Sequence, residues 1–157
     1  MELDFGQESY GTHFDSFMRH YLTVKTGSIP RLGDTYDAFK IYSRSDNVKS
    51  AGVEALVEDI QRFSRYYCTM ALGVEKDKKL SIAFHDLREL KVEVADPFLL
   101  ELYHDYSFDM LSREDFLAME HEILTVLYPY RISRMTLILT GPYRFKKWIG
   151  NFMRSTD

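Results

Sequence analysis

The sequence predicts an all-α protein, a single domain of about seven or eight amphipathic helices packed around a long central helix. Two observations lead to this expectation. Apolar residues recur three or four positions apart in successive segments, which gathers them on one face of a helix. Residues that commonly start or stop helices lie at the ends of these segments, and little or no sheet is expected.

The first helix is expected to follow a short lead-in. Residues 1–11 have no sustained apolar period and contain two glycines, so we expect the helical domain to cover residues 12–157. Over residues 12–26 the apolar side chains fall on one face of a helix. Thr12 is its expected N-cap, and Gly27 can adopt the left-handed conformation that ends it.

A break and a second, shorter helix are expected next. Pro30 lacks an amide donor and Gly33 is conformationally permissive, so both interrupt helical structure. Asp34 can cap a helix over residues 35–44. The polar stretch 43–52 then separates this helix from the central one.

The central helix is expected over residues 53–72. Its charged side chains fall on one face, and its apolar ones on the other are Val53, Leu56, Val57, Ile60, Phe63, Tyr67, Met70 and Ala71. Ser50 is the expected N-cap and Gly73 the expected stop. Such a helix is about 30 Å long, so several shorter helices can pack along it.

Three further helices are expected after the central one. Asp77 is a candidate cap for the first of them. Asp96 followed by Pro97 predicts the start of the second, because the carboxylate can cap and proline is tolerated in the first turn. Ser112 opens a sequence that resembles a capping box, and the helix that follows should end before Pro129. Beyond it, residues 135–140 fit either a helix or a strand, and a closing helix is expected after Pro142, with Tyr143, Trp148, Ile149, Phe152 and Met153 as its apolar residues.

Composition restricts the class of protein. The 157 residues are 45% hydrophobic and 28% charged, with a formal net charge of −4, as in a soluble globular protein. No run of 18 apolar residues is present, and the acidic start of the chain does not resemble a secretory signal, so a cytoplasmic location is expected. The single cysteine, Cys68, cannot form an internal disulfide and is expected to be an inert, partly buried thiol.

The amino-acid sequence of the helices from Phe14 to Leu127 resembles that of a known family. The most distinctive stretches are RHYLTVKTG at residues 19–27 and DPFLLELY at residues 96–103. They are similar to the helical central region of the GmrSD-type modification-dependent restriction endonucleases, a phage-defence family. In that family an N-terminal ParB-like domain is associated with nucleotide hydrolysis, and a C-terminal His-Asn-His domain is the nuclease. The resemblance implies that this chain connects or positions such domains.

The family's catalytic motifs do not occur in this sequence. An Asp-Gly-Gln-Gln-Arg motif needs adjacent glutamines, whereas the only two glutamines are Gln7 and Gln61. No histidine lies three positions before a proline, so the His-x-x-Pro element is missing as well, and the chain departs from the family pattern after Pro129. We therefore expect a non-catalytic spacer or interaction domain whose partners are nuclease or nucleotide-hydrolysing domains of the same system.

Other candidate sites in the sequence are weak. Glu101 and His104 have the Glu-x-x-His spacing of carboxylate-bridged di-iron bundles, but no second such pair occurs, and a surface histidine explains the same residues. Glycine-rich phosphate loops and a serine nucleophile elbow are absent from the sequence. We therefore expect no catalytic residue, metal or cofactor.

Two alternative functions come from the basic and aromatic residues. From Arg131 to Arg154 the chain has six basic residues and no acidic one. With its rings this tail could pair with phosphates and stack on bases, or the rings could belong to the core. Its candidate nucleic-acid-binding residues are Arg131, Arg134, Arg144, Lys146, Lys147, Trp148 and Arg154. The second alternative is an oligomerising interaction protein, in which some of the 11 tyrosines, 11 phenylalanines and one tryptophan face a partner.

Overall fold

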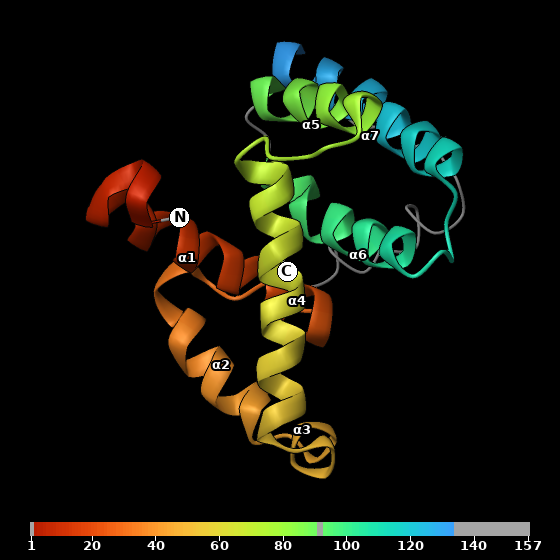
Figure 1. Cartoon of the computed structure of the whole chain (residues 1–157). Helices are drawn as coiled ribbons and strands as arrows, with labels where there is room; N and C mark the ends of the chain where they lie inside the picture. Colours follow the sequence, from red (N-terminus) through yellow and green to blue (C-terminus); the bar gives the residue numbers. More distant parts are fainter. Residues whose placement is uncertain (1, 91–92, 134–157) are drawn as a thin grey trace.

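The computed structural model describes the backbone of residues 2–90 and 93–133, and the side chains of 11–89 and 93–125. Over these residues the protein is all-α and contains no strand, which confirms the predicted fold class. Two single-turn 3-10 helices, η1 (Leu32–Asp34) and η2 (Glu93–Ala95), accompany the α-helices. The α-helices are α1 (Glu2–Thr26), α2 (Thr35–Ser43), α3 (Asp46–Ala51), α4 (Val53–Ala71), α5 (Lys78–Leu90), α6 (Asp96–Ser107) and α7 (Arg113–Ser133) (Figure 1).

Helix α4 runs through the middle of the molecule, as the sequence predicts (Figure 1). Helices α5 and α7 lie side by side across one end of it, and α2 and α3 lie at the other end. Helices α1 and α6 pack on each other and on α4 between these two ends. None of the described helices is long and apolar enough to cross a membrane.

The buried side chains form one cluster that joins five helices. Most of the apolar residues of helix α6 belong to this cluster, and aromatic rings from the other helices surround them. The largest fully buried side chains are Tyr21, Leu22, Phe63, Leu80, Phe84, Leu100, Phe116 and Ile123. Burial of side chains of this size stabilises the fold by roughly 1.5–3 kcal/mol each.

The apolar face of α4 is buried only in its second half. Phe63, Tyr67 and Met70 lie in the core, whereas Val53 is 74% exposed and Val57 is 58% exposed. The first half of α4 instead projects beyond the core together with α2 and α3. We refer to α2, α3 and residues 53–59 of α4 as the arm.

Several helix ends follow the predicted local signals. Gly27 and Gly73 follow α1 and α4 with φ values of 70° and 67°, the left-handed conformation that glycine adopts without strain. Asp77 caps α5, because its Oδ1 accepts hydrogen bonds from the amides of Lys79 (2.9 Å) and Leu80 (3.2 Å).

The start of α7 also follows its predicted signal. The Ser112 hydroxyl oxygen accepts a hydrogen bond of 3.1 Å from the amide of Asp115, as a capping residue does. The carboxylate of Asp115 accepts from the Ser112 hydroxyl at 2.7 Å rather than from its backbone amide, so the reciprocal half of a capping box is replaced.

Two predictions near the N-terminal side of the chain were wrong. Helix α1 begins at Glu2, so residues 2–11 are helical rather than a lead-in, and Thr12 lies inside the helix instead of capping it. Ser50 does not cap α4 because it belongs to α3, where its hydroxyl donates to the carbonyl of Asn47. A buried Val48 anchors this short helix, which the polar composition of the stretch concealed.

Two later predictions were also wrong. Helix α7 continues past Pro129 to Ser133, and the proline removes the one amide that would bond the carbonyl four residues earlier. Asp96 is the first residue of α6 and not its cap: the N-cap is Ala95, and no side chain caps this end. The Asp96 carboxyl group therefore does not serve as a helix cap.

Candidate functional site

A cavity of about 380 Å³ lies beside the core, where α1, α4, α5, η2 and α6 meet. One part of its lining is apolar, formed by Met70, Ala71, Phe84, Leu87 and Leu99. The other part is polar, formed by His13, Tyr67, Arg88, Glu93 and Asp96. Cavities of this size with an apolar body and a few converging polar groups are the usual form of small-ligand sites in proteins.

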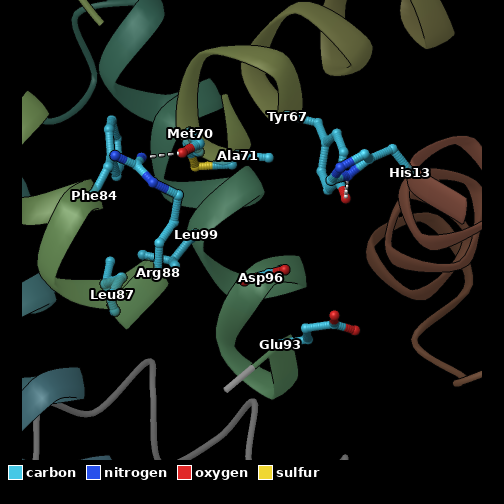
Figure 2. Close-up of a pocket in the computed structure, with 10 residues that line it drawn as sticks. All are labelled: His13, Tyr67, Met70, Ala71, Phe84, Leu87, Arg88, Glu93, Asp96 and Leu99. Carbon is cyan, nitrogen blue, oxygen red and sulfur yellow. Dashed lines mark hydrogen bonds between the residues drawn. The ribbon is translucent and has the colours of Figure 1, made fainter. Parts of the chain in front are cut away.

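Three of the five polar groups are already engaged in contacts between helices. On one side of the cavity the Nδ1 atom of His13 lies 3.4 Å from the hydroxyl of Tyr67, joining α1 to α4. On the opposite side Arg88 of α5 donates from Nη1 to the carbonyl oxygen of Met70. Figure 2 shows both hydrogen bonds, with Asp96 between the two sides and Glu93 beside it. The cationic group of the cavity is thus bound to the carboxyl end of α4, where helix carbonyls favour positive charge.

The two carboxyl groups of the cavity are not engaged in this way. Glu93 and Asp96 stand three residues apart, where η2 leads into α6. Among the described residues neither carboxyl group meets a lysine or arginine within ion-pair distance. The nearest described polar group to Asp96 is His20, whose Nδ1 lies 3.5 Å from Oδ2, beyond the length of a good hydrogen bond.

Burial shifts the protonation of this pair toward the neutral forms. The Asp96 side chain is 31% accessible, but it opens onto the cavity and not onto bulk water. Burial, and then the neighbouring Glu93 carboxylate, raise the pKa of Asp96 to about 8. His20 is 4% exposed, and burial together with Arg19 lowers its pKa to about 4. At neutral pH the pair therefore consists mainly of a carboxylic acid and a neutral imidazole.

A second cavity, of about 220 Å³, adjoins the first through Glu93. Its lining includes Arg19, Thr23, Pro97 and the buried His20. The Nδ1 atom of His20 has no hydrogen-bond partner among the described residues. A buried nitrogen without a hydrogen-bond partner lowers the stability of the folded state. The contacts around His20 are therefore not optimised for stability.

The cavity offers binding groups rather than a nucleophile or a metal site. No three His, Cys, Asp or Glu side chains among the described residues converge closely enough to hold a metal ion. Cys68 is partly buried, and burial raises the pKa of its thiol, which keeps it in the protonated, unreactive form. The groups that face the open space are carboxyl, imidazole and phenol groups against an apolar wall.

Within the described residues, the lining of the cavity includes none of the sequence-predicted site candidates. His104 is stacked against Phe63, with ring centroids 5.2 Å apart, and contacts Phe108, so it fills space at the edge of the core. Of the basic tail residues, Arg131 lies in α7 but its side chain is outside the described residues. Arg134, Arg144, Lys146, Lys147, Trp148 and Arg154 are outside them entirely.

Sequence reasoning missed the cavity residues. The only signal was His20, a polar residue within the buried stretch of α1 between Met18 and Thr23. Asp96 gave a misleading signal, because aspartate before proline is a common way to begin a helix.

Comparison with known proteins adds no relative to this description. The chain matches no family model, and searches of curated proteins and of solved structures found no significant match. The resemblance to GmrSD-type endonucleases therefore stays a prediction.

Proposed function

We propose that this chain is a non-catalytic helical interaction domain, which connects or positions the nuclease and nucleotide-hydrolysing domains of a GmrSD-like restriction system. The single observation that supports the interaction role is the divided use of α4. Its second half forms the core, while its first half presents Val53 and Val57 to the outside. The single cysteine fits a cytoplasmic location for such a system.

The arm is the surface that we propose for contact with those domains. Two large apolar side chains of α2, Tyr36 and Ile41, are exposed there in addition to the two valines of α4. Scattered apolar residues are normal on a surface, but two exposed on α2 and two on α4 give a partner apolar area to cover. The acidic residues next to these valines along α4, Glu54 and Glu58, would form a polar rim beside it.

The test is co-purification with the catalytic domains of a GmrSD-like protein encoded beside the chain or fused to it. We expect a stoichiometric complex that is lost in the double variant Val53→Glu/Val57→Glu. The matched control is Val74→Glu, an equally exposed valine in the connection between α4 and α5, outside the arm. If the arm variant binds as well as the parent, or if the parent only self-associates in sedimentation experiments, the interaction role proposed here is wrong.

A second candidate function rests on the charge distribution of the sequence. Six basic residues without an acidic one, interleaved with aromatic rings, favour binding of DNA or RNA by the C-terminal residues. The test is fluorescence anisotropy of labelled duplexes and single strands at low and physiological salt. Binding that weakens steeply with salt and is lost in the triple variant Arg144→Glu/Lys146→Glu/Lys147→Glu would support it. Absence of binding at low salt would exclude it.

A further inference from the structure

The cavity between α1, α4, α5 and α6 has an unequal distribution of charge. Its one cationic group, Arg88, is bound to the Met70 carbonyl at 2.6 Å and is thereby directed to the end of α4. Its two acidic groups, Glu93 and Asp96, have no cationic partner among the described residues. Within the described part of the chain the cavity therefore offers two carboxyl groups that no lysine or arginine neutralises.

The aromatic wall beside the acidic pair suits a cation. Tyr67 lines the same cavity as the two carboxyl groups, with its hydroxyl joined to His13 and its ring also packed on Phe17 and His20. A ring beside carboxylates is the combination that binds ammonium groups, because the ring quadrupole and the carboxylates both attract positive charge. Burial, followed by Asp96 and Glu93, raises the pKa of Tyr67, so its hydroxyl stays protonated beside the cavity.

The rest of the cavity favours an apolar body on the ligand. Met70, Ala71 and Leu99 form its wall together with Phe84 and Leu87. A volume of about 380 Å³ is at the small end of the range for ligand sites, which suits a compact molecule rather than a nucleotide or a peptide.

We propose that this cavity is a binding site for a small organic ammonium ion, with its charged nitrogen between Asp96 and Glu93 and its apolar body against Met70, Ala71 and Leu99. Neither the resemblance nor the interaction role of the arm assigns this site. The ligand class is an alkyl- or arylalkylamine, recognised by charge at one end and by shape at the other.

Binding is coupled to loss of a proton. In the empty cavity Asp96 holds its proton at pH 7, because its pKa is about 8. An ammonium ion beside it stabilises the carboxylate, so the carboxyl O–H bond breaks and the proton passes to the buffer, while the amine keeps its own. The charged or titratable groups that face Asp96 from the surrounding elements are His13, Arg19, His20, Tyr67, Arg88 and Glu93. His20 does not take up the proton, since its pKa is about 4.

The experiment is isothermal titration calorimetry of the full chain at pH 7 with phenethylamine. The same titration with 2-phenylethanol and with 3-phenylpropionate separates charge from shape. We expect the amine to bind at least about tenfold more tightly than either control. Repetition in buffers of different ionisation enthalpy should show release of close to one proton per bound amine.

Two variants locate the site. Asp96→Asn should weaken amine binding at least about tenfold and abolish proton release, whereas Asp37→Asn, an exposed aspartate of α2, should change neither. Ala71→Met fills the apolar part of the cavity and should block binding without lowering the melting temperature. Ala71→Met also serves as the decisive variant if Asp96→Asn fails to fold.

Three results would overturn the assignment. The first is equal binding of amine and alcohol, which would mean an apolar cavity without charge recognition. The second is amine binding that survives Ala71→Met. The third is the absence of saturable binding by both phenethylamine and hexylamine at millimolar concentration. Complex formation through the arm is measured separately, so failure of either proposal leaves the other to be judged on its own.

Discussion

Arg88 of α5 binds the last turn of α4 through Nη1, which donates a hydrogen bond of 2.6 Å to the carbonyl oxygen of Met70. This carbonyl is one of the four at the end of α4 that have no partner within the helix. The guanidinium group also lies against Gly73, where an added Cβ would come within 3.0 Å of Nη2. One side chain therefore closes a helix end and packs on the glycine that follows it.

The two left-handed glycines should differ in their tolerance of alanine. Gly27→Ala should cost about 1 kcal/mol of unfolding free energy, from backbone strain alone, because nothing lies near its missing Cβ. Gly73→Ala adds crowding by Arg88, so we expect about 2 kcal/mol. Urea denaturation measures both. In an Arg88→Ala background the cost of Gly73→Ala should fall to that of Gly27→Ala, and an unchanged difference would contradict the role of Arg88.

The stability of the protein should fall between pH 7 and pH 8 because of Asp96. The folded chain holds the Asp96 proton up to a pKa of about 8, whereas an unfolded aspartate has a pKa of 3.8. The unfolded state therefore binds fewer protons across this window, and its relative free energy drops as pH rises. His20 acts in the opposite direction, but only between its folded pKa of about 4 and its unfolded value of 6.5.

Chemical denaturation at a series of pH values checks this prediction. We expect the parent to lose up to about 1 kcal/mol of stability from pH 7 to pH 8, and Asp96→Asn to lose little. Asp37→Asn should keep the slope of the parent. A slope that is the same in all three proteins would show that the Asp96 proton is not retained.

Replacement of Glu120 by glutamine should stabilise the protein at neutral pH and above. Its side chain is 4% exposed, its Oε1 has no hydrogen-bond partner among the described residues, and burial, followed by Asp86, raises its pKa to about 7. The advantage of Glu120→Gln should grow from pH 5 to pH 7 and reach about 1–2 kcal/mol, since ionisation of the buried carboxyl is then avoided. Glu54→Gln on the exposed face of α4 is the control. A pH-independent difference would contradict the shifted pKa.

Tyr21 should contribute through its hydroxyl as well as its ring. The hydroxyl donates to Oδ2 of Asp59 at 2.8 Å, and Lys25 forms an ion pair with the same oxygen at 2.7 Å. Tyr21→Phe should therefore lower the unfolding free energy by about 1.5–3 kcal/mol, the usual contribution of a hydrogen bond to a charged group. Thermal and urea unfolding measure the loss. Tyr36→Phe, at an exposed tyrosine, should have almost no effect, and a similar loss there would argue against a specific contribution of the hydrogen bond.

Local signals predicted the fold well where the physics is local. The stops at Gly27 and Gly73 depend on a single residue's freedom to adopt positive φ, and both were confirmed. The cap at Asp77 depends on groups two and three residues away, and it was confirmed too. The fold class followed from periodicity, because helices of this length must each bury a face.

The parts that were missed depend on tertiary contacts. Asp96 and His20 are 76 residues apart, and only the packing of α6 on α1 brings them together. Val48 holds α3 in place by burial, which its polar neighbours in sequence do not reveal. The cavity is a property of five elements at once, so no single stretch of sequence encodes it.

The continuity of α4 links the two proposed sites mechanically. Seventeen residues separate Val53 in the arm from Met70 in the cavity wall, which is about 26 Å along one unbroken helix. A helix of that length is stiff. A partner that displaces the arm would therefore also displace the cavity wall at the other end of the helix. Between these two ends of the helix, Phe63 packs on Tyr21 of α1, with ring centroids 5.7 Å apart.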